Sequence, residues 1–178
     1  MEKKSLWTVG TREVVYMAIG AALYAVFSWI FNIFLVIPGT ANVAVRPAVV
    51  IPLFFGAVFG PWVGLFTGLV GNIIGDLLSG WGFWIWWDIG NGLMGLFAAF
   101  AFFSTKRNYA LAELWAAIGV IIGMGLASLS EMWVSGADMN AVISFNFVPA
   151  ALTNLVNGLI LLPILLRAYM AVTRRAGR

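Results

Sequence analysis

The sequence predicts an all-α integral membrane protein, a bundle of six transmembrane helices that makes up a single membrane domain over residues 1–178. The chain is 62% hydrophobic and only 10% charged, whereas soluble domains are about 45–50% apolar and about 25% charged. Its 178 residues leave room for six spans of about 20 residues with short connections, and for no separate soluble domain. The lipid bilayer is therefore the expected solvent for most side chains.

Proline, glycine and polar residues mark the expected ends of the spans. The first span opens after Glu13 and closes before Pro38, where continuing a helix becomes costly. Gly60 and Pro61 permit only a tight turn, so the second and third spans are expected to form a helical hairpin. Pro163 is expected to kink the sixth span. We place the six spans at residues 14–35, 47–59, 61–78, 86–103, 111–133 and 144–170.

Basic residues predict the orientation. When the N-terminus is placed in the cytoplasm, nine of the ten basic residues fall on the cytoplasmic side and only Arg46 lies outside, as the positive-inside rule requires. The nine are Lys3, Lys4, Arg12, Lys106, Arg107, Arg167, Arg174, Arg175 and Arg178. Their short clusters beside apolar runs also argue against a nucleic-acid partner. We therefore predict a multi-pass protein of the cell membrane with both termini in the cytoplasm.

The chain lacks the residues that most catalytic chemistry needs. It has no cysteine and no histidine, which excludes thiolate nucleophiles, imidazole bases and the usual zinc or haem ligands. It also has no G-x-x-x-x-G-K-[ST] phosphate loop, so it does not bind ATP in that mode. We expect a non-catalytic protein without metal or cofactor, whose energy for any active transport comes from a partner or an ion gradient.

Small residues recur at every fourth position in two spans. The ridges are Gly60, Gly64, Gly68, Asn72 and Asp76 in the third span, and Gly119, Gly123, Ala127 and Glu131 in the fifth. Residues four apart share a helix face, so such ridges let helices pack closely, with the carboxylates as solvated helix ends. The alternative is that Asp76 and Glu131 mark a substrate or ion path, because ionisable groups are costly at membrane depth.

Asparagines and aromatic residues gather toward the same outer side. The asparagines within or at the outer ends of spans are Asn72, Asn91, Asn146, Asn154 and Asn157. A carboxamide in hydrocarbon either bonds across helices or faces a ligand. The aromatic residues at this interface are Trp81, Phe83, Trp84, Trp86, Trp87, Trp133, Phe145 and Phe147. An aromatic belt explains any one of them, but four tryptophans within residues 81–87 also suit stacking on a flat ring.

Alanines of the first span form two overlapping A-x-x-x-A pairs, Ala18 with Ala22 and Ala21 with Ala25. A flat alanine strip lets another helix approach closely. The strip serves either internal packing or the docking of a separate membrane subunit.

Several stretches together resemble the substrate-binding S components of energy-coupling factor (ECF) vitamin transporters. They are the opening TREVVYMAIGAALY, the run FGAVFGPWVGLFTGLVGNIIGD over residues 55–76, WDIGNGLMGL at the start of the fourth span, and VPAALTNLVNGL in the sixth. The second stretch is the most specific of the four. The resemblance covers nearly the whole chain.

The resemblance implies a six-helix protein that captures a vitamin or vitamin precursor at its outer face and associates with a transmembrane T component and two cytoplasmic ATPases. It places the alanine strip against the T component and makes residues 39–46 a gating loop over the site. The closest subgroup takes riboflavin, hydroxymethylpyrimidine or thiamine-like precursors, with cobalamin as an alternative. The aromatic and asparagine content favours a flat, neutral heterocycle with hydrogen-bonding edges.

We therefore expect a ligand site between the outer ends of spans three to six, under the first connector. Trp84 and Trp133 would stack on the ligand. The polar contacts would be Asn72, Asp76, Asn91, Glu131 and Asn154. The rival hypothesis is a self-sufficient secondary transporter or channel for a small polar molecule, driven by protons through Asp76 and Glu131. A membrane-embedded enzyme or scaffold is a third alternative, which the missing histidine and cysteine disfavour.

Overall fold

The computed structural model describes residues 7–40, 42–101 and 108–176, with side chains described as far as residue 173. Within these ranges the chain is helical apart from its connectors and one isolated β-bridge between Val36 and Ala44. The elements in order are α1 (Thr11–Phe34), the 3-10 turn η1 (Pro47–Val49), α2 (Val50–Phe59), α3 (Pro61–Leu78), α4 (Ile85–Ala98), the 3-10 turn η2 (Ala99–Ala101), α5 (Tyr109–Val134), α6 (Met139–Ala141), the π-helix η3 (Val142–Phe147) and α7 (Val148–Ala176).

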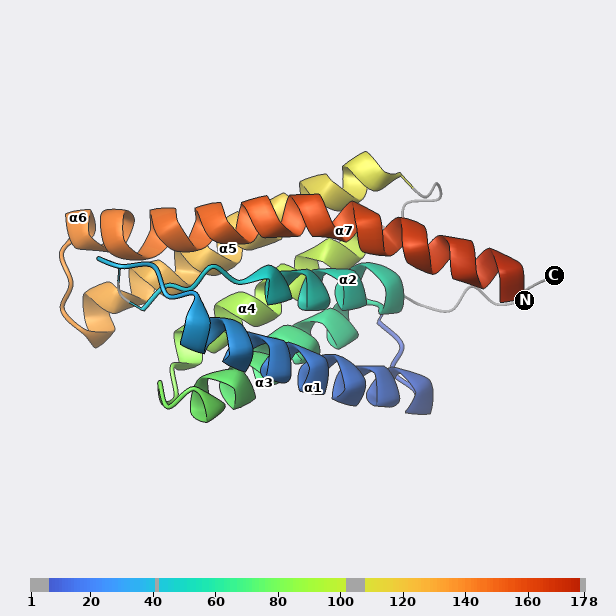
Figure 1. The fold of residues 1–178 in the computed structure, drawn as a ribbon, viewed down its shortest axis with the longest axis horizontal. Coiled ribbons are helices and arrows are strands. Elements are labelled where there is room, and N and C mark those ends of the chain that lie inside the picture. The colour runs from blue at the N-terminus through green and yellow to red at the C-terminus, as the bar shows by residue number, and fades with distance from the viewer. Residues whose placement is uncertain (1–6, 41, 102–107, 177–178) are drawn as a thin grey trace.

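The helices lie along one axis as a bundle and alternate in direction (Figure 1). The start of α1 and the end of α7 lie at the same end of the bundle, and the connectors that follow α1, α3 and α5 lie at the opposite end, here called the connector end. The predicted hairpin forms between α2 and α3. Gly60 has a φ of 114°, in the left-handed region that glycine adopts most easily, and Pro61 is the first residue of α3.

Within the described residues, four helices are long and apolar enough to cross a membrane. They are Thr11–Phe34, Pro61–Leu78, Tyr109–Val134 and the continuous stretch Met139–Thr173. The other two predicted spans correspond to shorter helices, Pro47–Phe59 and α4. The described chain is therefore all-helical with several membrane-spanning helices, while the count of six spans and the cytoplasmic termini stay predictions. The predicted orientation also depends on Lys3, Lys4, Lys106, Arg107 and Arg178, which lie outside the described residues.

The two predicted glycine ridges form the seams between α3, α4 and α5. A Cβ atom on Gly64 of α3 would overlap the carbonyl group of Gly95 on α4, and a Cβ atom on Gly123 of α5 would overlap the carbonyl group of Gly90 on α4. Only glycine allows backbones to approach so closely. Helix packing therefore accounts for most of each ridge, and each ridge ends in its carboxylate at the connector end.

The alanine strip of α1 is divided between two faces. Ala21 and Ala25 are 3% and 2% exposed and pack against α3, whereas Ala18 and Ala22 are exposed. The two pairs are three residues apart, which rotates one pair about 60° from the other around the helix axis. Ala21 and Ala25 are therefore inside the bundle, and only Ala18 and Ala22 lie on a surface that a partner helix can reach.

Candidate ligand-binding site

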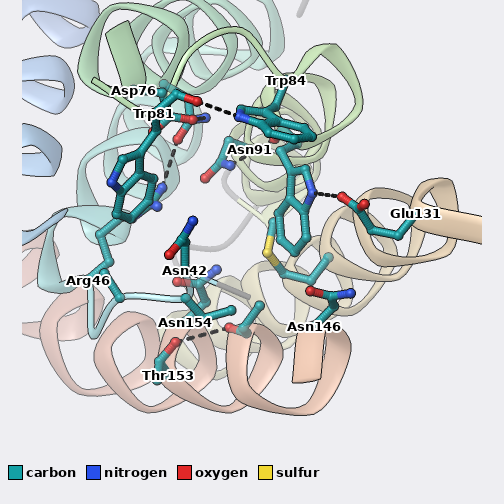
Figure 2. Close-up of a pocket in the computed structure, with 16 residues that line it drawn as sticks. Asn42, Arg46, Asp76, Trp81, Trp84, Asn91, Glu131, Asn146, Thr153 and Asn154 are labelled. Carbon is teal, nitrogen blue, oxygen red and sulfur yellow. Dashed lines mark hydrogen bonds between the residues drawn. The ribbon is translucent and has the colours of Figure 1, made fainter. Parts of the chain in front are cut away.

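A cavity of about 190 Å³ opens at the connector end of the bundle. It lies between the connector after α1, the ends of α3 and α5, the start of α4, η3 and the first turns of α7. Its lining residues are Asn42, Val43, Ala44, Arg46, Asn72, Asp76, Trp81, Trp84, Trp87, Asn91, Met124, Glu131, Asn146, Ala150, Thr153 and Asn154. Figure 2 shows Trp81 and Arg46 on one side of the cavity and Glu131 on the other, with Asn42 between them.

Six of the seven side chains that the sequence places in the site line this one cavity. They are Asn72, Asp76, Trp84, Asn91, Glu131 and Asn154. Trp133 is not among the lining residues: it is 57% exposed and packs edge-on against Trp86, with ring centroids 5.6 Å apart. Glu131 and Trp133 are two positions apart on α5, so they point about 160° away from one another around the helix, and only one of them can face the cavity.

A hydrogen-bond network on the α3 side uses both polar atoms of the Asn72 side chain. The Arg46 Nη1 donates to Asn72 Oδ1 at 2.8 Å, and Asn72 Nδ2 donates to Asp76 Oδ2 and to Asp88 Oδ1, each at 2.8 Å. Both amide hydrogens are therefore occupied, and their carboxylate partners fix the orientation of the amide group. Asn72 thus links the connector after α1 to α3 and α4.

The same network extends to α1. Asn32 Nδ2 donates to Asp76 Oδ1 at 3.2 Å and to Ser79 Oγ at 3.1 Å. Asn32 and Asp76 are 2% and 4% exposed. The Asn32 amide nitrogen is bonded, whereas the Asn32 Oδ1 is buried without a partner in the described part of the chain. The hydrogen bonds of Asn32 Nδ2 hold the end of α3 against α1.

Arg46 is partly buried in the connector between α1 and η1, and it joins this network through its hydrogen bond to Asn72. Its guanidinium carbon lies 6.0 Å from the centroid of the Trp81 ring, which is a cation–π contact. Burial alone would lower the pKa of Arg46, but its neighbours Tyr24 and Asp76 outweigh that effect and the pKa is raised above its ordinary value. The guanidinium is therefore positively charged.

Two other side chains of the cavity are held by hydrogen bonds at the start of α4. Trp87 Nε1 donates to Glu131 Oε1 at 2.8 Å. Asn91 Nδ2 donates to the Trp87 carbonyl oxygen at 2.8 Å, and Asn91 Oδ1 accepts from the Tyr24 hydroxyl at 2.6 Å. Trp87 is thus oriented as one aromatic wall. Trp84 is 41% exposed, with its Nε1 donating to the Trp81 carbonyl oxygen at 2.8 Å, so it lies at the rim.

Asn146 and Asn154 have unused hydrogen-bonding capacity. Asn146 is 5% exposed, and its Oδ1 is buried without a hydrogen-bond partner in the described part of the chain. It lies in the π-helix η3, a type of distortion that occurs frequently at functional sites. The Nδ2 of Asn154 makes one weak contact, with Met94 Sδ at 3.9 Å. A ligand in the cavity would satisfy these two amides.

Several lining residues were not in the predicted set. Asn42, Arg46, Trp81, Trp87, Asn146 and Thr153 all line the cavity. The sequence did carry a signal for Arg46, because it is the only basic residue predicted on the outer side. Asn146, Trp81 and Trp87 belong to the asparagine and tryptophan groups noted in the sequence. Asn42 and Thr153 gave no distinctive signal.

The arrangement suits binding of a small molecule. Aromatic rings, amides and carboxylates converge on one small cavity, as in ligand sites generally. Among residues 7–40, 42–101 and 108–173, no group of three or more acidic, histidine or cysteine side chains is placed to hold a metal ion. The fold and the cavity thus define a multi-pass helical membrane protein with a candidate small-molecule site at one end.

Comparison with known proteins gives the family. The profile of the family described as ECF-type riboflavin transporter, S component, matches residues 8–171. A UPF0397 protein of Vibrio atlanticus (strain LGP32) is 33% identical over 131 residues, which cover 67% of this chain and 70% of that protein. A UPF0397 protein of Aliivibrio salmonicida (strain LFI1238) is 31% identical over 134 residues, covering 69% and 71%.

The chain belongs to the ECF-type riboflavin transporter S-component family, so the resemblance found in the sequence is confirmed. S components are substrate-binding subunits of ECF transporters and are generally not enzymes.

Proposed function

We propose that this protein is the substrate-binding subunit of an ATP-driven ECF-type importer and captures a vitamin or vitamin precursor at the outer face of the cell membrane. The observation that carries the proposal is the cavity at the connector end, which combines tryptophan walls with amide and carboxylate side chains. The membrane orientation in this proposal has both termini in the cytoplasm, so the connector end faces outward.

The size and lining of the cavity favour a small, flat heterocycle. A cavity of about 190 Å³ suits riboflavin-like, hydroxymethylpyrimidine-like or thiamine-like rings far better than cobalamin, which has a much larger ring system. Trp87 supplies an oriented aromatic face, and Asn146 and Asn154 supply amide edges. The substrate class we favour is therefore riboflavin or a hydroxymethylpyrimidine or thiamine-like compound.

Identification of a co-purified small molecule tests this proposal directly. The full-length protein would be extracted in mild detergent, examined by native mass spectrometry and titrated with a vitamin panel while tryptophan fluorescence is recorded. We expect one vitamin or precursor to bind with a stoichiometry near one and to quench fluorescence. An empty protein that binds no member of the panel would contradict the proposal and favour the ion-coupled transporter hypothesis.

The proposed partners are a transmembrane T component and two ATPase subunits, and the exposed alanines of α1 are the proposed contact. Ala18 and Ala22 are exposed and small, so a helix of the T component can approach α1 closely there. We expect Ala22→Leu to reduce co-purification with the T component and leave ligand affinity unchanged. Val156→Leu, on the exposed face of α7, is the matched control and should affect neither. Undiminished co-purification of Ala22→Leu would place the partner elsewhere.

A further inference from the structure

The charged side chains that line the cavity are predominantly acidic. Among the described residues that form its lining, Arg46 is the only cation, while Asp76 and Glu131 are carboxylates. Asp88 lies directly behind Asn72 and adds a third carboxylate to the same region. The site therefore carries more negative than positive formal charge.

The positive charge of Arg46 is already balanced within the protein. Arg46 is bonded to Asn72, and the same amide group bridges to Asp76 and Asp88. An anion placed beside Arg46 would thus also lie close to two carboxylates, and like charges at short range in a partly buried site repel one another strongly. A phosphate group would add about −1.5 to −2 units of charge at neutral pH.

The opposite side of the cavity offers hydrogen-bond acceptors. Glu131 uses one carboxylate oxygen to accept from Trp87, and its second oxygen makes no hydrogen bond within the described residues. The buried Oδ1 of Asn146 is likewise without a partner there. Figure 2 shows both side chains on the same side of the cavity, on α5 and on the adjoining π-helix. An ionised carboxylate only accepts hydrogen bonds, so this edge recognises donors.

We propose that the cavity selects a flat ring that donates hydrogen bonds to Glu131 and Asn146 and carries no negative charge, and that it rejects the phosphate esters of the same compounds. This inference rests on the proposed function and assigns the chemical form of its substrate. Free vitamins or precursors bind, whereas their phosphorylated forms meet the excess of carboxylate over guanidinium charge in and beside the cavity.

Matched pairs of ligands test the inference on the unaltered protein. The probes are riboflavin and riboflavin 5′-phosphate, thiamine and thiamine monophosphate, and hydroxymethylpyrimidine and its phosphate. Each would be titrated against the detergent-purified full-length protein by tryptophan fluorescence. For the pair that binds, we expect the free compound to bind at least about tenfold more tightly than its phosphate ester. An unfavourable contact between two negative charges lowers affinity by at least this factor.

Two outcomes separate the inference from the proposed function. If a phosphate ester binds within about threefold of its free compound, or more tightly, the charge selection is wrong while the vitamin-binding function stands. If none of the six compounds binds, the proposed substrate class fails, and this inference fails with it.

A pair of glutamate variants then tests the role of Glu131. Glu131→Gln removes the negative charge but keeps an oxygen that can accept from Trp87 Nε1. We expect this variant to bind the free compound about tenfold more weakly. The ratio of the affinity for the free compound to that for its phosphate ester should also become smaller. Glu113→Gln is the matched control, since Glu113 lies on the same helix at the other end of the bundle. If the affinity ratio is unchanged in Glu131→Gln, then Glu131 does not contribute to discrimination against the phosphate ester.

Discussion

The two sides of the cavity use polar side chains in opposite ways. The α3 side, formed by Arg46, Asn72 and Asp76, is a network in which both amide hydrogens of Asn72 already have carboxylate acceptors. Its two buried atoms without partners in the described chain, Asn32 Oδ1 and Asp88 Oδ2, belong to residues outside the cavity lining. The α5–α7 side, formed by Glu131, Asn146 and Asn154, retains polar atoms without protein partners in the described chain or with one weak contact. We call these the bonded side and the free side.

The difference indicates a division of labour. Hydrogen bonds on the bonded side join the connector after α1 to α3 and α4, so these residues hold the cavity together. Polar atoms on the free side gain partners only when something enters the cavity, and leaving them buried and unbonded is unfavourable in the meantime. Substitutions on the bonded side should therefore reduce stability, and substitutions on the free side should reduce affinity.

The largest expected effect comes from breaking the bonded side. Asn72→Leu leaves Arg46, Asp76 and Asp88 without the amide that joins them, and we expect a loss of about 3 kcal/mol in the free energy of unfolding. The measurement is the midpoint of heat-induced aggregation in detergent, followed by size-exclusion chromatography. Asn157→Leu is the control, because the Asn157 side chain bonds, among the described residues, only to the Thr153 carbonyl oxygen one helical turn away. Equal stability of the two variants would contradict the stabilising role assigned to the bonded side.

The next effect concerns the seam that sets the distance between α4 and α5. We expect Gly123→Ala to destabilise the protein by about 1–3 kcal/mol, because its Cβ would overlap the Gly90 carbonyl. Gly125→Ala, two residues along α5, should be neutral or slightly stabilising: its Cβ would meet only Phe147 at 3.9 Å, and alanine favours helix. Thermal unfolding of both variants measures the difference, and similar midpoints would disprove the close α4–α5 contact.

On the free side, Asn146→Ala should separate affinity from stability. It removes a buried oxygen that has no partner among the described residues, so the unfolding midpoint of the empty protein should stay the same or rise. Ligand affinity should fall about tenfold. Fluorescence titration and thermal unfolding of the same preparation provide both values. The control is Asn140→Ala, at an exposed position on α6, which should change neither value. If Asn146→Ala lowers the unfolding midpoint, Asn146 stabilises the empty protein and does not belong to the free side.

The smallest effect is expected at Trp133. It lies outside the cavity lining, so Trp133→Phe should change ligand affinity by less than about twofold, the scale of a side chain without ligand contact. Trp87→Phe loses the hydrogen bond to Glu131 and should weaken both the affinity and the ligand-induced quenching. Fluorescence titration of the two variants gives the comparison. A large loss in Trp133→Phe would show that the ligand extends beyond the cavity.

Helical periodicity alone predicts that several of the cavity-lining side chains lie close together. Asn72 and Asp76 lie four residues apart on the third-span ridge, and Glu131 ends the ridge on the fifth, so both ridges were expected to deliver polar groups to the same outer end. Trp133 follows Glu131 by two positions on the same helix, which directs its side chain away from the cavity.

The alanine strip of α1 shows what residue spacing alone does not predict. Spacing alone identified Ala18, Ala21, Ala22 and Ala25 as small residues on neighbouring faces of one helix. It did not decide which pair faces the bundle, because that depends on the rotation of α1 against α3. The burial of Ala21 and Ala25 is a property of the assembled helices.

The sequence by itself determined the class of protein, the approximate positions of the helices, and the end of the bundle where polar and aromatic residues meet. Hydropathy and small-residue spacing are local properties, and they dictate these features directly. Only the tertiary structure decided that Arg46 reaches Asn72 from the connector and that Asn146 faces the cavity without a partner among the described residues. The path of a connector and the extra residue in each turn of a π-helix change which way a side chain points without changing hydropathy. The division between a bonded side and a free side therefore arises from how the helices and the connector pack together.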